Sequence, residues 1–564
     1  MGIPSYFFHI IQTYGNRFFR KSSKVSRLFL DLNCCIHGCK NRVLQEYKGD
    51  IITKQQTIDF ENKVIAEVIR TINRFCEETR PTELLWIAVD GVVPLAKMVQ
   101  QRERRMRAVE DRKHIRDIYV REGRPLPKEW DSNAITPGTP FMLRMCDTIR
   151  SNLNKIKDTC GVKHIDMNDV RIPGEGEQKI FAYLRENPGL DKDFADVIYG
   201  LDADLIVLSL LHYCNPTQKS PLILLREEQA FGKLIKTPEG DDVLTQFLVS
   251  DFASIIPLEW GKKDDISLLR DYIVLMSLMG NDFVPHTPSL TFRSEAMERI
   301  IDAYKAVNVR IVNTKPNKEG YYGIQWNNLV KVIQRLQLQE QSTLVEESRA
   351  LERIRERIRL GHIPYRHAER EDPVEQEIMA MDWEHIGWDD KLRVEEEGWK
   401  ERYYKSICGQ YGEFSKVSEM KETVCQTYID SIHWCWLYYN GYPVPGDKCY
   451  TFANGPLLED IVKYLEERSV EKLPSSSNII TDGTLKVNDI PVEAQLIVVL
   501  PRQSHHLLPD WTHTIVERCS HLYPTNCKLW YWGKRHKWEC VSVLPRIPIE
   551  YVTELVNKFK PKSV

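Results

Sequence analysis

Short apolar runs alternate with amphipathic stretches over the first 335 residues of the chain. Three of these runs are SRLFLD (26–31), LLWIAVD (84–90) and ADVIYG (195–200), and apolar residues at helical spacing follow each of them. Strands of a parallel sheet are buried on both faces and appear as continuous apolar runs, with crossover helices between them. The pattern predicts an α/β fold over residues 1–335, with a mostly parallel central sheet and flanking helices.

The pattern changes twice after residue 335. Residues 336–405 begin with a highly charged stretch that has only a thin apolar stripe, which predicts a charged helical connector. In residues 406–564, tryptophan, tyrosine and proline are dense at first, and the apolar runs QLIVVLP (495–501) and WECVSVLP (538–545) follow. We interpret both runs as strands, so that residues 406–564 form a second, mixed α/β segment.

One helix start is marked clearly in the segment TPGTP (136–140). The hydroxyl of Thr139 can accept a hydrogen bond from the first turn of a helix, as N-cap residues do. Pro140 then suits the first helical position, where a backbone N–H would have no partner in the helix. We expect a helix to begin at Pro140.

The composition narrows the class of protein. A chain of 564 residues and 66.0 kDa is too long for one core, and its net charge of −3 gives no general attraction to nucleic acid. No apolar run approaches the roughly 18 residues that span a bilayer.

The fourteen cysteines contain no C-x-x-C pair, which indicates reduced thiols. Because no dense lysine and arginine run marks a nuclear address, we expect a cytoplasmic protein that binds no membrane.

Acidic side chains recur where the predicted strands end. Asp31 and Asp90 close two strands, and Asp202 and Asp204 follow a third. Because ligands bind at the carboxyl edge of an open α/β sheet, we expect these side chains to meet in one crevice. With two acids at a helix opening and one after a later apolar stretch, the candidates are Asp31, Asp90, Glu175, Glu177, Asp202, Asp204 and Asp282.

Seven carboxylates in one crevice would repel one another. At about 5 Å and an effective dielectric constant near 20, each like-charged pair is destabilised by roughly 3 kcal/mol, so cations must neutralise the cluster. Oxygen ligands alone suit Mg²⁺ or Mn²⁺ better than Zn²⁺. Taken singly, Glu175 and Glu177 could instead complement a helix dipole, and Asp90 with Gly91 could form a turn.

A basic segment follows the second of these strands. Between Lys97 and Lys128 the chain has eleven lysines or arginines and five acids. On a helix, one sector about 100° wide holds Lys97, Gln101, Arg104 and Arg105. Such a cationic face suits the negative charge of a terminal phosphate monoester. A solvated helix face is the alternative interpretation of this run of charge.

Read together, several segments resemble the Xrn family of 5′-to-3′ exoribonucleases. In the family's order they are MGIPSYF (1–7), LDLNCCIH (30–37), DGVVPLAKMVQQRERR (90–105), DSNAITPGTPFM (131–142), PGEGEQK (173–179), YGLDADLIVLSL (199–210) and GNDFVPH (280–286). A weaker resemblance continues through residues 406–564. The resemblance implies a core like that of PIN and flap nucleases, in a compact member that consists of the catalytic region.

The resemblance also implies an activity. The chain is expected to hydrolyse single-stranded RNA with a 5′ monophosphate, processively from the 5′ end, to 5′-mononucleotides. The seven acids would bind two Mg²⁺ ions, or Mn²⁺, of which one presents an activated water and the other stabilises the leaving oxygen. Lys97, Gln101, Arg104 and Arg105 match the family's pocket for the 5′ phosphate, which would exclude a cap or a triphosphate by its size.

Two more residues enter through the same resemblance. His37 matches the family's base-stacking histidine, with a buried core histidine as the alternative. Asn33 either orders the edge of the metal site or stabilises a turn.

The chain departs from the family in its second segment. Members commonly carry a tryptophan-bearing S-W-x-W stretch, one tryptophan of which stacks on the RNA bases, where this chain has NGYPVPGDKCYTF (440–452). Tyr442 or Tyr450 could stack on the bases instead. We expect Trp434 and Trp436, at helical spacing, to be core residues.

Two other functions fit parts of the pattern. A flap-type 5′ DNA nuclease shares the acids at strand ends, but the sequence shows no glycine-rich helix-hairpin-helix segment that would grip a duplex. A catalytically silent RNA-binding scaffold would have no need of all seven acids. A preference for RNA over DNA depends on contacts to the 2′-hydroxyl, for which the sequence shows no motif.

Overall fold

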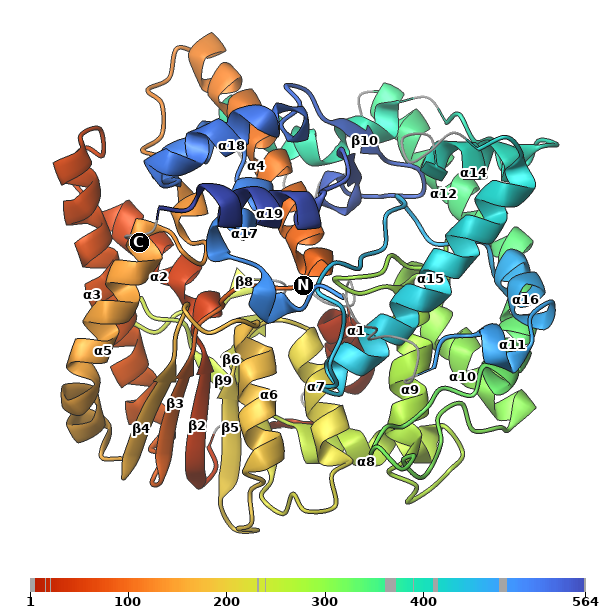
Figure 1. The fold of residues 1–564 in the computed structure, drawn as a ribbon, viewed down its shortest axis with the longest axis horizontal. Helices are drawn as coiled ribbons and strands as arrows, with labels where there is room; N and C mark the ends of the chain where they lie inside the picture. Colours follow the sequence, from red (N-terminus) through yellow and green to blue (C-terminus); the bar gives the residue numbers. More distant parts are fainter. Residues whose placement is uncertain are drawn as a thin grey trace.

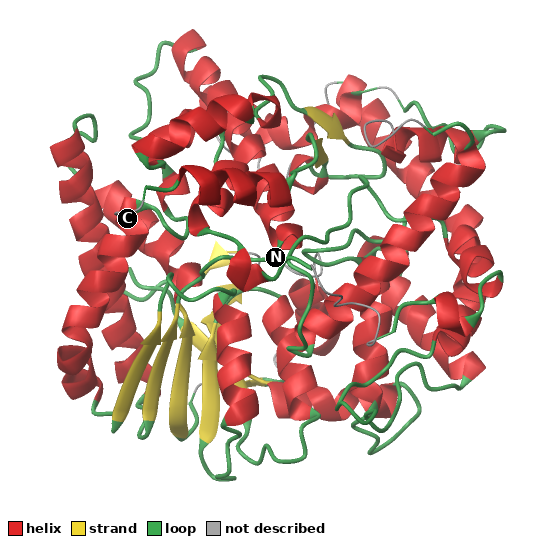
Figure 2. Cartoon of the chain, in the orientation of Figure 1, coloured by secondary structure: helices red, strands yellow, loops and turns green. Residues whose placement is uncertain are grey.

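The fold is that of a computed structural model, which describes residues 6–561 except 16, 21, 231–232, 239, 361–371, 389, 409–413 and 476–483. A central sheet with helices on both faces occupies one side of the molecule, and a mainly helical region occupies the other (Figure 1 and Figure 2). The predicted α/β fold is confirmed.

The central sheet has seven strands in the order β1-β9-β6-β5-β2-β3-β4. Their bounds are β1 Phe19–Arg20, β2 Val25–Asp31, β3 Leu84–Ala88, β4 His164–Asn168, β5 Ala195–Tyr199, β6 Leu222–Glu227 and β9 Leu244–Leu248. Neighbours from β6 to β4 run parallel, whereas β9 pairs antiparallel with both β6 and β1. The five parallel strands therefore end at one edge of the sheet, as predicted.

The helices of the first 337 residues are α1 Tyr6–Tyr14, α2 Leu32–Glu46, α3 Lys54–Thr79, α4 Leu95–Arg121, α5 Pro140–Cys160, α6 Gly176–Glu186, α7 Asp204–Tyr213, α8 Val249–Glu259, α9 Leu268–Met276, α10 Ala296–Val307 and α11 Trp326–Gln337. The later helices are α12 Glu340–Arg359, α13 Pro373–Ala380, α14 Trp399–Cys408, α15 Val417–Tyr439, α16 Leu458–Glu466, α17 Val492–Val499, α18 His513–Arg518 and α19 Ile549–Phe559. α5 begins at Pro140 as predicted, and Thr139 Oγ1 accepts a hydrogen bond from the Met142 amide at 3.4 Å.

Alternate side chains of the parallel strands enter two hydrophobic layers. Phe29 and Trp86 pack into the layer that includes residues of α6 and α7. Leu28, Leu30 and Leu85 pack into the layer formed with α2, α3 and α5. Figure 1 shows these two sets of helices on opposite sides of the sheet. The layer with α6 and α7 continues into α15 and α16, so the sheet and the helical region share one hydrophobic cluster.

The second segment contains less strand than its sequence indicates. WECVSVLP includes β11 (Val541–Val543), which pairs antiparallel with β10 (Lys528–Trp530). The strand predicted for QLIVVLP is wrong, because these residues lie in α17 and its C-terminal flank. All residues of α17 except Val492 are buried, and a short helix buried on every side has the same continuous apolar run as a buried strand.

The C-terminal segment packs against the side of the long helix α4. Arg102 Nη1 donates to the Pro545 carbonyl at 2.6 Å, and its Nη2 donates to the Leu522 carbonyl. Arg107 Nη1 donates to the Trp538 carbonyl at 2.6 Å. Figure 1 shows α4 rising beside α17, α18 and α19. Part of the basic run therefore has a structural role, since these two guanidinium groups bond to the backbone of the same chain.

The described part of the chain contains neither a helix that could span a membrane nor a disulfide bond. None of its helices combines the length and the apolar character that crossing a bilayer requires. All fourteen cysteines are free thiols.

Candidate active site

Asp31 and Asp90 stand at the ends of neighbouring parallel strands. β2 ends with Asp31, and Asp90 follows the end of β3 by two residues. The first residue of α6, Gly176, lies against both side chains: a Cβ added there would come within 2.7 Å of Asp31 Oδ1 and 3.4 Å of Asp90 Oδ1. A residue with a side chain would push the two carboxyl groups away from α6, so glycine allows this close approach.

Asn33 and Gly176 hold Asp90 in place. Asn33 Nδ2 donates to Asp90 Oδ2 at 2.9 Å, and Asn33 Oδ1 accepts from the Asp90 amide at 3.1 Å. The Gly176 amide donates to Asp90 Oδ1 at 2.7 Å. Of the two roles considered for Asn33, these contacts favour ordering of the acidic cluster.

Lys97 reaches from α4 into the acidic cluster. Its Nζ lies 2.5 Å from Glu175 Oε2 and 2.8 Å from Asp282 Oδ2. Burial alone would lower the pKa of this ammonium, but the charges of Asp282 and Glu175 hold the pKa well above its ordinary value. Lys97 is expected among the phosphate-binding residues, whereas in this structure its ammonium pairs with two of the candidate metal ligands.

Glu177 and Asp204 are buried among like charges. Burial and the charges of Glu175 and Asp204 raise the pKa of Glu177 well above its ordinary value. Burial and the charge of Asp282 raise the pKa of Asp204 to about 8. Both side chains are less than 5% exposed, so solvent screens this repulsion poorly.

Asp31 and Asp202 belong to the same group. Burial, with the charges of Asp90 and Asp202, raises the pKa of Asp31 well above its ordinary value. The structure therefore brings all seven acids predicted from the sequence to the carboxyl edge of the sheet or next to it.

Three carboxylate oxygens of this cluster are buried without a hydrogen-bond partner among the described residues: Asp31 Oδ1, Glu177 Oε2 and Asp204 Oδ2. Buried oxygens need partners, and carboxylate oxygens are the ligands that Mg²⁺ and Mn²⁺ prefer. Within the described part of the chain, no three acidic, histidine or cysteine side chains are already closed around one metal position. The donor set fits divalent ions, which would draw the unpaired oxygens together.

Two tyrosines of α15 complete the cluster from the helical region. The Tyr438 hydroxyl donates to Glu175 Oε1 at 2.7 Å, and the Tyr439 hydroxyl donates to Asp204 Oδ1 at 3.2 Å. Sequence reasoning missed both residues, because WCWLYYNG reads as an apolar core helix. The available signal was the pair of hydroxyl groups, since a buried tyrosine hydroxyl usually has a hydrogen-bond partner.

The cationic face of α4 continues away from the acids. Arg105 Nη1 donates to Gln101 Oε1 at 3.1 Å, and Arg105 Nη2 donates to Thr136 Oγ1 at 2.9 Å. Arg104 is exposed and forms no hydrogen bond or ion pair with the described residues. Burial and the adjacent charge of Arg104 lower the pKa of Arg105. Neither guanidinium group forms an ion pair with a carboxylate among the described residues, and two such neighbouring groups favour an anion at this face.

His37 lies on α2 beside this face. Its side chain is exposed, so the structure does not support the alternative of a buried core histidine. Neighbouring protein atoms, which displace part of the water around the ring, and the charges of Arg104, Lys40 and Arg105 lower the pKa of His37. The imidazole is therefore neutral at pH 7, which leaves a ring free of charge that a base can stack on.

The two tyrosines considered as replacements for the family's tryptophan are held by the protein. Tyr450 is 6% exposed, and its hydroxyl donates to a backbone carbonyl at 2.7 Å. Tyr442 packs edge-on against Tyr321 with ring centroids 4.3 Å apart. Trp434 and Trp436 are buried, as expected. Neither tyrosine lies open beside the acids as a second stacking surface.

Two family models match the chain. The model described as XRN 5′-3′ exonuclease N-terminus matches residues 1–228, and the model described as Xrn1 helical domain matches residues 262–377 and 364–562. The first match contains α4 and six of the seven acids, and the second contains Asp282 and α15.

Curated relatives are similar along most of the chain. It is 26% identical over 642 residues to 5′-3′ exoribonuclease 2 of Arabidopsis thaliana, which covers 92% of this chain and 61% of the relative. It is 25% identical over 666 residues to 5′-3′ exoribonuclease 1 of Schizosaccharomyces pombe, a match that covers 97% of this chain and 48% of the relative. A shorter match, 30% identical over 332 residues, is to 5′-3′ exoribonuclease 1 of Saccharomyces cerevisiae and covers 54% of this chain and 20% of the relative. The chain thus spans less than two thirds of the length of these relatives.

Proposed function

Because the chain belongs to the Xrn family of 5′-to-3′ exoribonucleases, we propose that it removes 5′-mononucleotides one at a time from single-stranded RNA with a 5′ monophosphate. The main support for the proposal is that α4 runs from the acidic cluster to the cationic face. Lys97, in its first turn, contacts the acids, whereas Arg104 and Arg105 lie two turns further on, about 10 Å along the axis. One helix therefore joins a cluster suited to cleavage to a face suited to the end of the RNA.

The charge of the RNA end supports this choice of substrate. A terminal phosphate carries about −1.5 to −2 charges, which Arg104 and Arg105 can balance, while the neutral amide of Gln101 can donate a hydrogen bond. A 5′-hydroxyl end has no charge to offer to this face. Each cleavage leaves a new 5′ monophosphate on the shortened RNA, so the product of one cycle is the substrate of the next.

The seven acids are assigned the binding of two divalent ions, Mg²⁺ or Mn²⁺. When bound, the ions supply an activated water and stabilise the leaving oxygen. The chain's own residues orient the ligands: Asn33 and Gly176 fix both oxygens of Asp90, and the α15 hydroxyls fix one oxygen each of Glu175 and Asp204. Contacts of this kind set the position and basicity of a metal ligand.

His37 is assigned to the first base of the RNA. Its neutral ring lies beside Arg104 and Arg105, where the first nucleotide would follow its phosphate. Since Tyr442 and Tyr450 are both held by other residues of the protein, we infer that neither of them grips the bases from the other side. We therefore expect shorter processive runs than a two-sided base clamp would give.

The proposed compartment is the cytoplasm. Fourteen free cysteines suit a reducing environment, and the sequence has no dense basic run that would direct it to the nucleus. Fluorescence imaging of the tagged full-length protein checks this, and a nuclear signal would contradict it.

The central test compares RNA ends. Two RNAs of the same sequence, one with a 5′ phosphate and one with a 5′ hydroxyl, are incubated with the protein in Mg²⁺, and the products are separated by chromatography. We expect only the phosphorylated RNA to be degraded, to 5′-mononucleotides, and a DNA of the same sequence to be degraded more slowly. Equal rates on the two RNAs would remove the role assigned to the α4 face.

Two variants separate cleavage from binding. The double variant Asp202→Ala, Asp204→Ala should lose cleavage in Mg²⁺, because it removes two of the acids. Arg105→Gln should weaken the binding of the phosphorylated RNA in EDTA by about 10-fold or more, since a hydrogen bond to a charged group contributes about 1.5–3 kcal/mol. Full cleavage by the double variant would contradict the metal assignment.

A further inference from the structure

A cavity of about 400 Å³ lies beside the acidic cluster, between α4 and the C-terminal segment. It shares Asp282 with the acids and Arg104 with the cationic face. Its volume falls in the range of about 300–1,000 Å³ that is typical of ligand pockets. The other residues that line this cavity belong neither to the seven acids nor to the phosphate-binding face.

Lys534 places an ammonium group in that wall. The residue is 7% exposed, and its Nζ lies 2.7 Å from His286 Nε2. His286 Nδ1 lies 2.8 Å from the Thr287 carbonyl, so Nδ1 carries the hydrogen and Nε2 accepts from Lys534. Lys534 forms no ion pair with a carboxylate among the described residues. A buried cation whose partner is a neutral ring favours an anionic ligand.

Glu103, Asp282 and Glu539 line the cavity, and none of them forms an ion pair with Lys534. Glu539 is held by Arg293 through two hydrogen bonds of 2.7 and 3.0 Å. Asp282 is held by Lys97 at 2.8 Å. Glu539 acts on the Lys534 ammonium through its charge but does not contact it, so the ammonium can still bond to a ligand.

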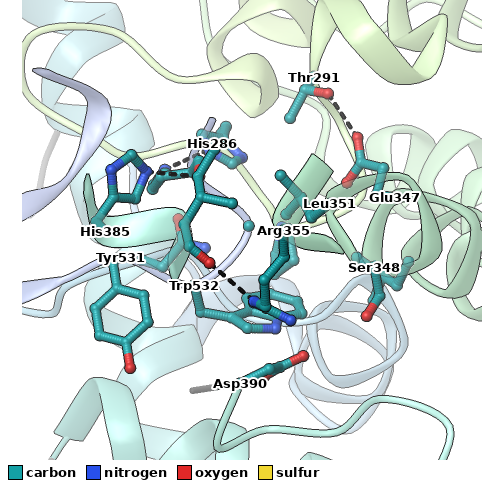
Figure 3. Close-up of a pocket in the computed structure, with 16 residues that line it drawn as sticks. His286, Thr291, Glu347, Ser348, Leu351, Arg355, His385, Asp390, Tyr531 and Trp532 are labelled. Atoms are coloured by element: carbon teal, nitrogen blue, oxygen red, sulfur yellow. Dashed lines mark hydrogen bonds between the residues drawn. The ribbon is translucent and has the colours of Figure 1, made fainter. Parts of the chain in front are cut away.

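His286 and Lys534 also line a second cavity, of about 30 Å³. Its volume is far below the roughly 300 Å³ at which ligand pockets begin. Figure 3 shows that two of its polar side chains have partners within the protein: Thr291 donates to Glu347 at 2.9 Å, and Arg355 donates to the Ile386 carbonyl at 2.8 Å. Of these two cavities, the larger one has the room to present an anion to Lys534.

Aromatic rings also line the larger cavity. Phe283, Tyr450, Phe452 and Trp538 contribute to the wall. Trp538 is 55% exposed, so its ring is accessible at the rim. Aromatic faces bind nucleobases of any sequence by stacking.

We propose that this cavity binds one nucleoside phosphate beside the catalytic cluster, with the phosphate at Lys534 and the base against the aromatic wall. The inference rests on the proposed function, because RNA degradation provides two sources of this ligand. One source is the released 5′-mononucleotide, and the other is a nucleotide within the RNA strand.

Calorimetric titrations in EDTA test the proposal without cleavage. The probes are 5′-AMP, adenosine and a pentaribonucleotide with a 5′ phosphate. The variants are Lys534→Gln, which removes the buried charge, and Trp538→Ala, which removes an exposed ring and keeps the test valid if Lys534→Gln does not fold. Their controls are Lys421→Gln, a lysine paired with Asp460 elsewhere, and Trp388→Ala, an exposed tryptophan outside the cavity.

We expect both cavity variants to bind 5′-AMP or the pentaribonucleotide roughly fivefold or more weakly, while both controls match the unaltered protein. Adenosine should bind weakly to all of them, because it lacks the phosphate. A loss confined to 5′-AMP identifies a product site, and a loss confined to the pentaribonucleotide identifies a position along the RNA. Unchanged binding of both probes in the two cavity variants would overturn the proposal.

The RNA-end test keeps this result separate from the proposed function. If the unaltered protein degrades 5′-phosphorylated RNA but the cavity variants bind normally, only the cavity assignment fails. If binding of 5′-AMP depends on Lys534 but no RNA is degraded, the nucleotide site stands and the proposed activity fails.

Discussion

The hydroxyl of Tyr438 links the helical region to a candidate metal ligand. Its hydrogen bond to Glu175 is 2.7 Å long and ends on a charged oxygen. We expect Tyr438→Phe to weaken the binding of Mn²⁺ by about 10-fold or more, as losses of such outer contacts commonly do, and to raise the Mg²⁺ concentration needed for cleavage. Electron paramagnetic resonance of bound Mn²⁺ measures the first effect and a Mg²⁺ titration of the cleavage rate the second.

The same helix offers a matched control. Tyr428 is buried in α15, but its hydroxyl has no hydrogen-bond partner among the described residues. Tyr428→Phe removes a hydroxyl without removing such a bond, so Mn²⁺ binding should not change. Equal losses in the two variants would mean that α15 affects the site through packing alone.

Asp204 couples the stability of the metal-free protein to pH. Its pKa is raised from about 3.8 to about 8 in the folded state, so between these values the folded protein binds a proton that the unfolded chain releases. The free energy of unfolding therefore falls as pH rises from about 4 to about 8. We expect the melting temperature in EDTA to decrease from pH 5.5 to pH 8, and the decrease to be smaller in Asp204→Asn.

Added metal should reverse this trend. Because metal ligands must be deprotonated, Mg²⁺ binds better at higher pH and should raise the melting temperature more at pH 8 than at pH 5.5. Differential scanning calorimetry at the two pH values, with EDTA or Mg²⁺, measures both effects. A Mg²⁺ effect that is the same at both pH values would contradict the assignment of Asp204 as a ligand.

Single residues differ in how far the sequence predicts their place. Asp31, Asp90 and Asp202 were predictable as neighbours, because strand ends of a parallel sheet meet at one edge whatever the rest of the chain does. The partners of Lys97 were not predictable, because helical spacing gives the direction of a side chain but not which charges its end will meet. The roles of Tyr438 and Tyr439 depend on contacts more than 230 residues away in the sequence, which no local pattern records.

At the scale of elements, α4 contains two arginines, two positions apart, that have different roles. Arg102 is 4% exposed and donates to two carbonyl groups of the C-terminal segment, whereas Arg104 is exposed and has no such contact. We expect Arg102→Met to destabilise the protein by about 2–4 kcal/mol, because it leaves buried carbonyl oxygens unpaired. Arg104→Met should change the stability by less than about 0.5 kcal/mol and weaken the binding of 5′-phosphorylated RNA.

Urea denaturation measures the stabilities of both variants, and fluorescence anisotropy in EDTA measures the binding of labelled RNA. The two variants serve as controls for each other, since each removes one positive charge from the same helix. If both lose the same stability and the same affinity, the division of tasks along α4 is wrong.

Two elements show why some boundaries follow from sequence and others do not. The start of α5 was predictable because capping by Thr139 and the missing amide hydrogen of Pro140 act within a few residues. The form of QLIVVLP was not, because burial on all sides removes the polar positions that distinguish a period of 3.6 from a period of 2. The error arose from the surroundings of α17 rather than from its own residues.

At the scale of the whole molecule, the acidic cluster lies where the sheet meets the helical region. Phe283, next to Asp282, packs against the rings of Trp434, Tyr438 and Tyr439. The hydrophobic cluster that begins in the sheet continues through this contact into α15 and α16. The overall α/β architecture was predictable from apolar runs, but the shared interface was not, since both surfaces read as ordinary core.

The position of Lys97 has a consequence for the order in which ligands bind. While its ammonium contacts Glu175 and Asp282, Lys97 has only one of its three N–H donors left for the phosphate of an arriving RNA. Under the proposed metal assignment, divalent ions would take over its role among the carboxylates and free it to turn toward the RNA end. By thermodynamic reciprocity, RNA that attracts Lys97 must then strengthen the hold on the ions by the same factor.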